Sequence, residues 1–113
     1  MRVVWLDLHD HDDDWLPEDP WDCESWATVD VGDDNRSASF QIHVCTPTSI
    51  ARFPDKRHCF LIEEYLGPKP LIIRLDEFIA MKTDSAPGDP YWELAHVWRW
   101  ECGKYDHHGH LIG

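Results

Sequence analysis

Histidine and aspartate side chains gather in two stretches of the chain, one near its start and one near its end. Imidazole and carboxylate groups are ligands for zinc and other transition metals. Their spacing matches neither a zinc finger, nor a thermolysin-type helix, nor a calcium-binding loop. Eight histidines among 22 acidic residues become neighbours by chance, and we expect no metal ion and no cofactor. The side chains concerned are His9, His11, Asp12, Asp13, Asp14, His107, His108 and His110.

Two other pairs of residues have the chemical types needed for catalysis. Glu63 and Glu64 are adjacent, but neighbouring side chains on a strand point to opposite faces and cannot share a substrate. Cys45 follows His43 by two residues on one predicted strand face, roughly 6 to 7 Å away at the backbone, which is too far for activation of a thiol. We interpret Cys45, like Cys59 on the next strand, as a buried structural thiol. Without a glycine-rich phosphate loop or a G-x-S-x-G motif, the chain is expected to bind a partner rather than to act as an enzyme.

The stretch 9–22 combines carboxylates with tryptophans and forms the predicted binding loop. Its two prolines and the mutual repulsion of its acids disfavour regular structure. Tryptophan is enriched among the residues that anchor protein interfaces, and carboxylates around such anchors complement a basic partner. The candidate contact residues are Asp12, Asp13, Asp14, Trp15, Glu18, Asp19, Trp21 and Asp22.

The formal net charge of −12 narrows the classes of partner. Nucleic acid and anionic membranes would be repelled, whereas a basic protein would be attracted and its association accelerated. The alternative is that the acidity serves solubility alone. No signal-peptide pattern and no apolar run of membrane-spanning length is visible, and the four cysteines form no C-x-x-C pair. We expect a cytoplasmic protein.

The elements that position these groups follow from hydrophobic periodicity. Phe40, Ile42 and Val44 alternate with polar residues as in a half-buried strand, and Thr46 and Pro47 suit the N-cap and first position of a short helix. The predicted strands cover 1–8, 25–31, 37–45, 59–65 and 98–102, and the predicted helices cover 48–53, 71–82 and 90–97, followed by a polar tail over 104–113 that we expect to fray.

These elements predict one α+β domain over 1–113: a mostly antiparallel sheet of about five strands with two or three helices packed on one face. The strands at 25–31 and 37–45 should form a hairpin, and the strands at 37–45 and 59–62 should pair at the centre of the sheet. The first strand is expected to be buried on both faces. Four tryptophans are assigned to the core, namely Trp5, Trp92, Trp98 and Trp100.

Several motifs resemble the immunity protein 8 family of bacterial polymorphic toxin systems, in order and approximate spacing, from about residue 37 to 105. The most specific is Val44-Cys45-Thr46-Pro47. The matching residues are Phe40, Val44, Cys45, Thr46, Pro47, Arg57, His58, Leu61, Ile62, Glu64, Tyr65, Tyr91, Trp92, Glu93, Leu94, Ala95, Trp100, Glu101 and Tyr105.

The resemblance implies a cytoplasmic antidote that binds the toxic C-terminal domain of an effector and neutralises it stoichiometrically. The motif residues read as structural, and the contacts with the toxin are expected in stretches peculiar to this chain, above all residues 9–22. The charge suggests a basic toxin, for example a nuclease whose groove the carboxylates block; binding away from the active site is an alternative. Two other classes stay open: a small metal-binding protein or enzyme that uses the His/Asp clusters, and a general interaction module.

Overall fold

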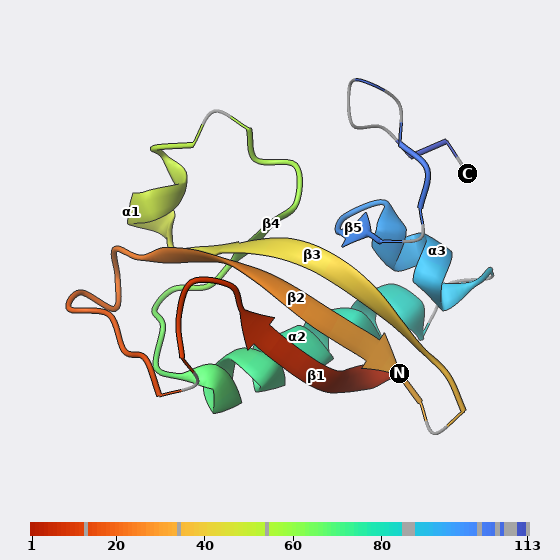
Figure 1. The fold of residues 1–113 in the computed structure, drawn as a ribbon, viewed down its shortest axis with the longest axis horizontal. Coiled ribbons are helices and arrows are strands. Elements are labelled where there is room, and N and C mark those ends of the chain that lie inside the picture. The colour runs from red at the N-terminus through yellow and green to blue at the C-terminus, as the bar shows by residue number, and fades with distance from the viewer. Residues whose placement is uncertain are drawn as a thin grey trace.

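A computed structural model gives the fold and describes residues 1–12, 14–33, 35–53, 55–84, 88–101, 103–105, 107 and 111–112. Within these residues the chain forms one mixed, mostly antiparallel sheet of five strands together with three helices (Figure 1), which confirms the α+β prediction. The elements are β1 (Arg2–Leu8), β2 (Glu24–Gly32), β3 (Ser37–Cys45), α1 (Pro47–Ile50), β4 (Cys59–Leu61), α2 (Pro68–Thr83), α3 (Pro90–Ala95) and β5 (Arg99–Trp100).

The strand order is β1-β2-β3-β4, and β5 pairs with β3. β1, β2 and β3 form an antiparallel meander, so the predicted hairpin of β2 and β3 is confirmed. β4 runs parallel to β3 beside His43 to Cys45, whereas β5 runs antiparallel beside Phe40 and Gln41. β4 and β5 therefore lie one after the other along the same edge of β3. The expected pairing of β3 with β4 is confirmed. β3 is central as expected, whereas β4 is an outer strand, so its expected position at the centre of the sheet is wrong.

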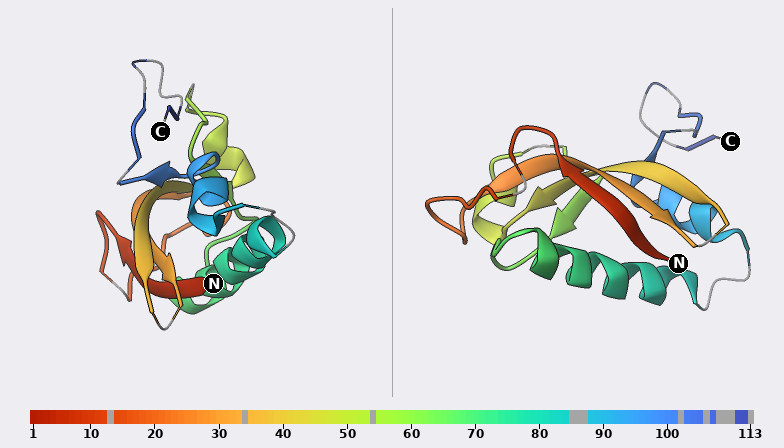
Figure 2. Two further views of the ribbon diagram at one scale, coloured as in Figure 1. Left: turned by 90° about the vertical axis from the view of Figure 1, so that its right-hand side faces the viewer. Right: turned by 60° about the horizontal axis from the view of Figure 1, so that its bottom comes forward.

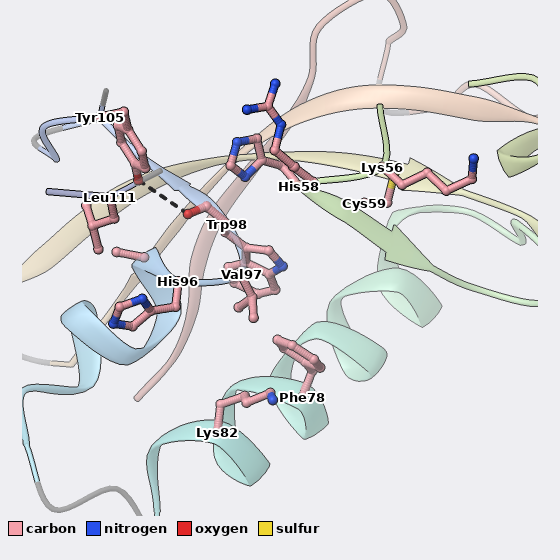
Figure 3. Close-up of a pocket in the computed structure, with 12 residues that line it drawn as sticks. Lys56, His58, Cys59, Phe78, Lys82, His96, Val97, Trp98, Tyr105 and Leu111 are labelled. Carbon is pink, nitrogen blue, oxygen red and sulfur yellow. Dashed lines mark hydrogen bonds between the residues drawn. The ribbon is translucent and has the colours of Figure 1, made fainter. Parts of the chain in front are cut away.

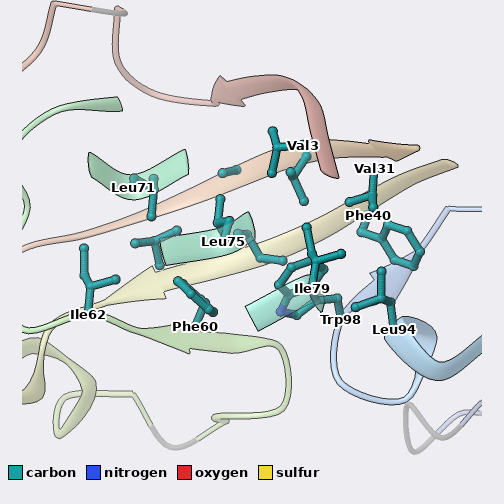
Figure 4. Packing of buried hydrophobic residues seen from close by; sticks show 14 of the residues in the cluster. Val3, Val31, Phe40, Phe60, Ile62, Leu71, Leu75, Ile79, Leu94 and Trp98 are labelled. Atoms are coloured by element: carbon teal, nitrogen blue, oxygen red, sulfur yellow. The ribbon is translucent and has the colours of Figure 1, made fainter. Parts of the chain in front are cut away.

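The core lies between one face of the sheet and the helices α2 and α3 (Figures 2 and 4). Alternate residues of β2 and β3 point into it, as their period of two predicts. From α2 the apolar stripe Leu71, Leu75 and Ile79 packs on them, at the helical spacing the sequence indicated. Leu94 of α3 and the following Trp98 close the far end. This confirms that α2 and α3 cover the same face.

β1 departs from the prediction because of a bulge. Its register against β2 shifts between Val3 and Trp5, so Val3 faces the core with Leu6 and Leu8 while Trp5 turns outward. Trp5 is 53% exposed and Val4 is exposed as well. The expected burial of β1 on both faces is therefore wrong, because none of the three helices in the described part of the chain covers the outer face of this edge strand.

The four tryptophans assigned to the core divide into two pairs. Trp98 is buried and Trp100 is half-buried against the core, which confirms the prediction for both. Trp5 and Trp92 are exposed, so their assignment to the core is wrong. For Trp92 the reason is the helical period of α3, whose buried face is formed by Tyr91, Leu94 and Ala95.

Several boundaries differ from the predicted ones. β4, β5 and α1 are shorter than expected, whereas α2 begins earlier, at Pro68. Gly67 precedes it with φ of 107°, a conformation that side chains with a Cβ rarely adopt, and proline suits the first helical position. The chain can thus turn sharply into α2. Of the predicted tail, Tyr105 and Leu111 pair in an antiparallel bridge, and Leu111 packs against the core. Residues 106, 108–110 and 113 lie outside the described part of the chain, so the expected fraying stays a prediction. Among the described residues, no helix has both the length and the apolar character that crossing a bilayer requires.

Candidate functional site

The acidic loop, residues 9–22, leaves the sheet between β1 and β2 and is held at three points. The backbone N–H of His9 donates to the carbonyl of Trp26 at 3.0 Å, and the N–H of Tyr65 donates to the carbonyl of Pro20 at 2.9 Å. Between them, the Trp15 side chain packs against the core and stacks on His11, with ring centroids 3.6 Å apart. The loop is therefore braced against the rest of the molecule.

The predicted contact residues differ in how accessible they are. Asp12, Asp14, Glu18 and Asp19 are exposed, and Trp21 is 60% exposed. Trp15 and Asp22 are half-buried, and Asp13 lies outside the described residues. Trp15 also lies 5.1 Å from the Tyr65 ring, between centroids. Trp15 is thus placed to hold the loop, whereas Trp21 presents its ring to solvent.

One ion pair and one hydrogen bond fix the end of the acidic loop. Asp22 forms an ion pair with Arg52, with 2.5 Å between Oδ1 and Nη1. The carboxylate of Asp19 accepts a hydrogen bond from the backbone N–H of Trp21 at 3.0 Å. Leu16, which the sequence did not single out, is another exposed apolar residue of this loop. The result is an acidic surface segment with two protruding apolar side chains.

A second accessible surface is the outer face of the sheet, the face not covered by α2 and α3 (Figure 1). Trp5 pairs with Asp30 across β1 and β2, and Trp26 pairs with His43 across β2 and β3. Trp26 is 41% exposed. Sequence reasoning missed Trp5 here because the bulge in β1 reverses the side on which it lies.

Below Trp26, the outer face holds a buried cluster, His43-Cys45-Cys59, which we call the His-Cys cluster. His43 is 2% exposed; the Trp26 ring stacks on it at 4.6 Å between centroids, and the Phe53 ring lies perpendicular to it at the same distance. The Cys45 and Cys59 sulfurs lie 4.0 Å apart, and the Cys59 sulfur lies 3.9 Å from Nδ1 of His43. The predicted placement of His43 and Cys45 on one strand face is confirmed.

The electrostatics of the His-Cys cluster disfavour a nucleophilic cysteine. Burial, followed by the neighbouring Cys59, raises the pKa of the Cys45 thiol to about 12. Burial also raises the pKa of Cys59, which is half-buried. Both groups are neutral thiols at neutral pH, and a thiol is a much weaker nucleophile than a thiolate. The expectation of a buried thiol holds for Cys45 and in part for Cys59.

This pKa leads to a test by alkylation. In reduced protein treated with a chelator, Cys45 should react with iodoacetamide at pH 8 far more slowly than Cys59, because its thiolate fraction is on the order of a thousandfold below that of an ordinary thiol and its side chain is buried. Peptide mass spectrometry over time measures both rates, with protein in guanidinium as the control that equalises them. Equal rates in the folded protein would contradict the assigned burial and pKa.

The histidine clusters noted in the sequence are not brought together by the described residues. His9 shares a hydrogen bond with the Thr28 hydroxyl at 2.6 Å, while His11 stacks on Trp15. His108 and His110 lie outside the described residues. Where the chain is described, it is His43, Cys45 and Cys59 whose ligand atoms lie within 4.8 Å of one another.

A groove of about 620 Å³ lies on the other side of Cys59 (Figure 3). It runs between the start of β4, α2 and the segment around Trp98, where the Tyr105 hydroxyl donates to the Trp98 carbonyl. Lys56 and Lys82 line it, so it differs in sign from the acidic loop. The burial of His58 lowers the pKa of its imidazole, helped by nearby arginines. Cys59 is the member of the His-Cys cluster that reaches this groove.

Comparisons with protein-family models, with curated proteins and with solved structures each find no match. The resemblance to an immunity family therefore rests on the motif residues alone, and function has to be argued from surface chemistry. The two features available are the braced acidic loop with its exposed apolar side chains and the buried His-Cys cluster.

Proposed function

We propose that this protein is an antidote that binds a basic toxin domain stoichiometrically and neutralises it in the cytoplasm. The observation that carries the proposal is the exposed Trp21 ring on the braced acidic loop, with Leu16 protruding nearby along the chain and exposed carboxylates between them. A tryptophan that is 60% exposed contributes little to the fold of its own chain and is the kind of residue that anchors an interface.

The bracing of the loop bears on affinity. Ordering a flexible loop at an interface makes binding less favourable, because each side chain that becomes immobilised loses conformational entropy. Here the backbone hydrogen bond from Tyr65 to Pro20 and the packing of Trp15 fix the loop before any partner arrives. More of the contact energy of Trp21 is then available for binding.

The charge bears on the rate of association. A net charge of −12 attracts a basic domain over a distance, and this steering raises the association rate most at low ionic strength. Fast capture suits an antidote, because a toxin acts from the moment it enters the cell. A nuclease, which must hold phosphates, is a basic toxin of suitable chemistry. The motif resemblance supplies the class of function, and the loop supplies a means of binding.

The test is co-expression with the C-terminal domain encoded by the neighbouring larger gene. Rescue of growth and co-purification in a one-to-one complex are expected. A toxic domain that this chain neither binds nor relieves would contradict the proposal. Binding without rescue would instead support a general interaction module.

A further inference from the structure

We propose that the His-Cys cluster is a zinc site, in which Nδ1 of His43 and the thiolates of Cys45 and Cys59 bind one Zn²⁺ ion. The ligands come from two neighbouring strands that the fold already holds in parallel register, His43 being paired with Cys59 across β3 and β4. Cys45 lies two residues further along β3 on the same face. This inference is independent of the antidote function.

The distances fit zinc with little movement. Two sulfurs at about 2.3 Å from a tetrahedral zinc ion lie about 3.8 Å apart, and those of Cys45 and Cys59 are 4.0 Å apart. A sulfur and an imidazole nitrogen on the same ion lie about 3.6 Å apart, and Cys59 Sγ is 3.9 Å from His43 Nδ1. The third pair, the Cys45 sulfur and the His43 imidazole, lies within 4.8 Å, so side-chain rotations that move ligand atoms by about 1 Å or less would close the site.

The surroundings of His43 orient it for this role. Metal-binding histidines commonly donate their other ring N–H to a carboxylate, which fixes the tautomer and makes the ligating nitrogen more basic. Nε2 of His43 lies 2.6 Å from Oε2 of Glu24, so Nδ1 is the nitrogen left facing the sulfurs. The Trp26 ring stacks on the imidazole, and the Phe53 ring packs perpendicular to it.

Charge and access are also satisfied. Two thiolates balance the two positive charges of Zn²⁺, so the ion and its direct ligands carry no net charge, which suits their burial. Thiolate and imidazole donors bind zinc in preference to magnesium or calcium, which favour oxygen donors. Cys59 is half-buried and lines two grooves, which gives the ion a route to the cluster. Three protein ligands leave the fourth tetrahedral position for water or another ligand.

The test uses untagged protein, reduced with a phosphine and stripped with a chelator, then titrated with Zn²⁺ against a chromophoric competitor. One tightly bound ion per chain is expected, with a raised thermal midpoint. Cys59→Ser should weaken binding by more than about 100-fold, and Glu24→Gln by about 10- to 100-fold. The matched control is Cys23→Ser, also half-buried but outside the cluster, which should bind as the wild type does.

Two further readouts separate the zinc site from trivial outcomes. Co²⁺ in place of Zn²⁺ should give a thiolate-to-cobalt charge-transfer band that Cys59→Ser reduces and Cys23→Ser keeps. Circular dichroism in chelator establishes that each variant is folded. Failure of the folded wild type to bind zinc, or equal affinity in Cys59→Ser, would overturn the proposal. Loss of binding in a His9→Ala/His11→Ala variant with Cys59→Ser unaffected would overturn it as well.

Discussion

Replacing Trp21 by alanine is expected to weaken binding of the cognate toxin domain by at least about 2 kcal/mol, roughly 30-fold in Kd. The ring is exposed in the free protein, so the change should leave the fold intact. The backbone N–H of Trp21, which donates to Asp19, is retained in alanine. The loss would therefore report on contact with the partner. Isothermal calorimetry or surface plasmon resonance on the purified pair measures it.

The matched control is Trp92→Ala. Trp92 is also an exposed tryptophan, at 37%, but it lies on α3, far along the chain from the acidic loop, where its ring meets that of His96. The free energy with which Trp92→Ala binds the toxin domain should stay within about 0.5 kcal/mol of the wild-type value. Equal losses in both variants, or no loss in Trp21→Ala, would place the interface elsewhere on the molecule.

The exposed carboxylates of the acidic loop should affect the association rate constant of the toxin domain, whereas Trp21 should affect the dissociation rate constant. Removing a rim charge changes the association rate and its salt dependence, whereas truncating a buried anchor changes the dissociation rate. Neutralising Asp12 and Asp14 is thus expected to slow association at low salt, and Trp21→Ala to speed dissociation. The two kinds of side chain in the loop can in this way be assigned separate roles.

The parts of the fold that could be predicted from sequence are those where local pattern decides. The bounds of β3 agree with the expected 37–45 because the alternation is uninterrupted and ends at Thr46-Pro47. The Asp89-Pro90 start of α3 was readable because the Asp89 carboxylate accepts from the N–H of Tyr91, as an N-cap does. Neither element needs a distant contact to define it.

What could not be predicted depends on long-range pairing. The bulge in β1 has no marker in the sequence, yet it decides that Trp5 faces outward. Trp15 and Trp21 stand in the same acidic, proline-containing stretch of sequence. What distinguishes them is a contact with Tyr65, fifty residues further along the chain, which Trp15 makes and which marks it as a supporting residue. Pattern alone treats both as candidate anchors.

The His-Cys cluster illustrates the same limit. Its components were recognised singly: His43 and Cys45 on one face, and Cys59 on a strand expected to pair with theirs. The direction and register of that pairing remained open, and a shift of one residue would turn Cys59 to the core face. Parallel pairing of His43 with Cys59 is what brings the three ligand atoms together.

The largest effect on stability is expected for Trp98→Ala, about 3 to 5 kcal/mol of unfolding free energy. Trp98 is 1% exposed; its ring stacks on Phe78 at 5.3 Å between centroids and meets the edges of Phe40 and Phe60 at 6.1 Å. Removing it would leave a cavity where the sheet, α2 and α3 meet, and none of these elements can close it without losing its own contacts. Denaturation by urea followed by far-ultraviolet circular dichroism gives the value without relying on tryptophan fluorescence.

Trp5→Ala is the control, since the sequence pattern placed both tryptophans in the core. With Trp5 on the open face of an edge strand, its removal should cost less than about 1 kcal/mol, chiefly from contacts with neighbouring strands. Similar losses in the two variants would mean that the outer face is covered in solution, by a second copy or another segment. Because a domain of this size has only about 5 to 15 kcal/mol of unfolding free energy in total, the expected loss in Trp98→Ala is a large share of it, whereas the loss in Trp5→Ala is a small one.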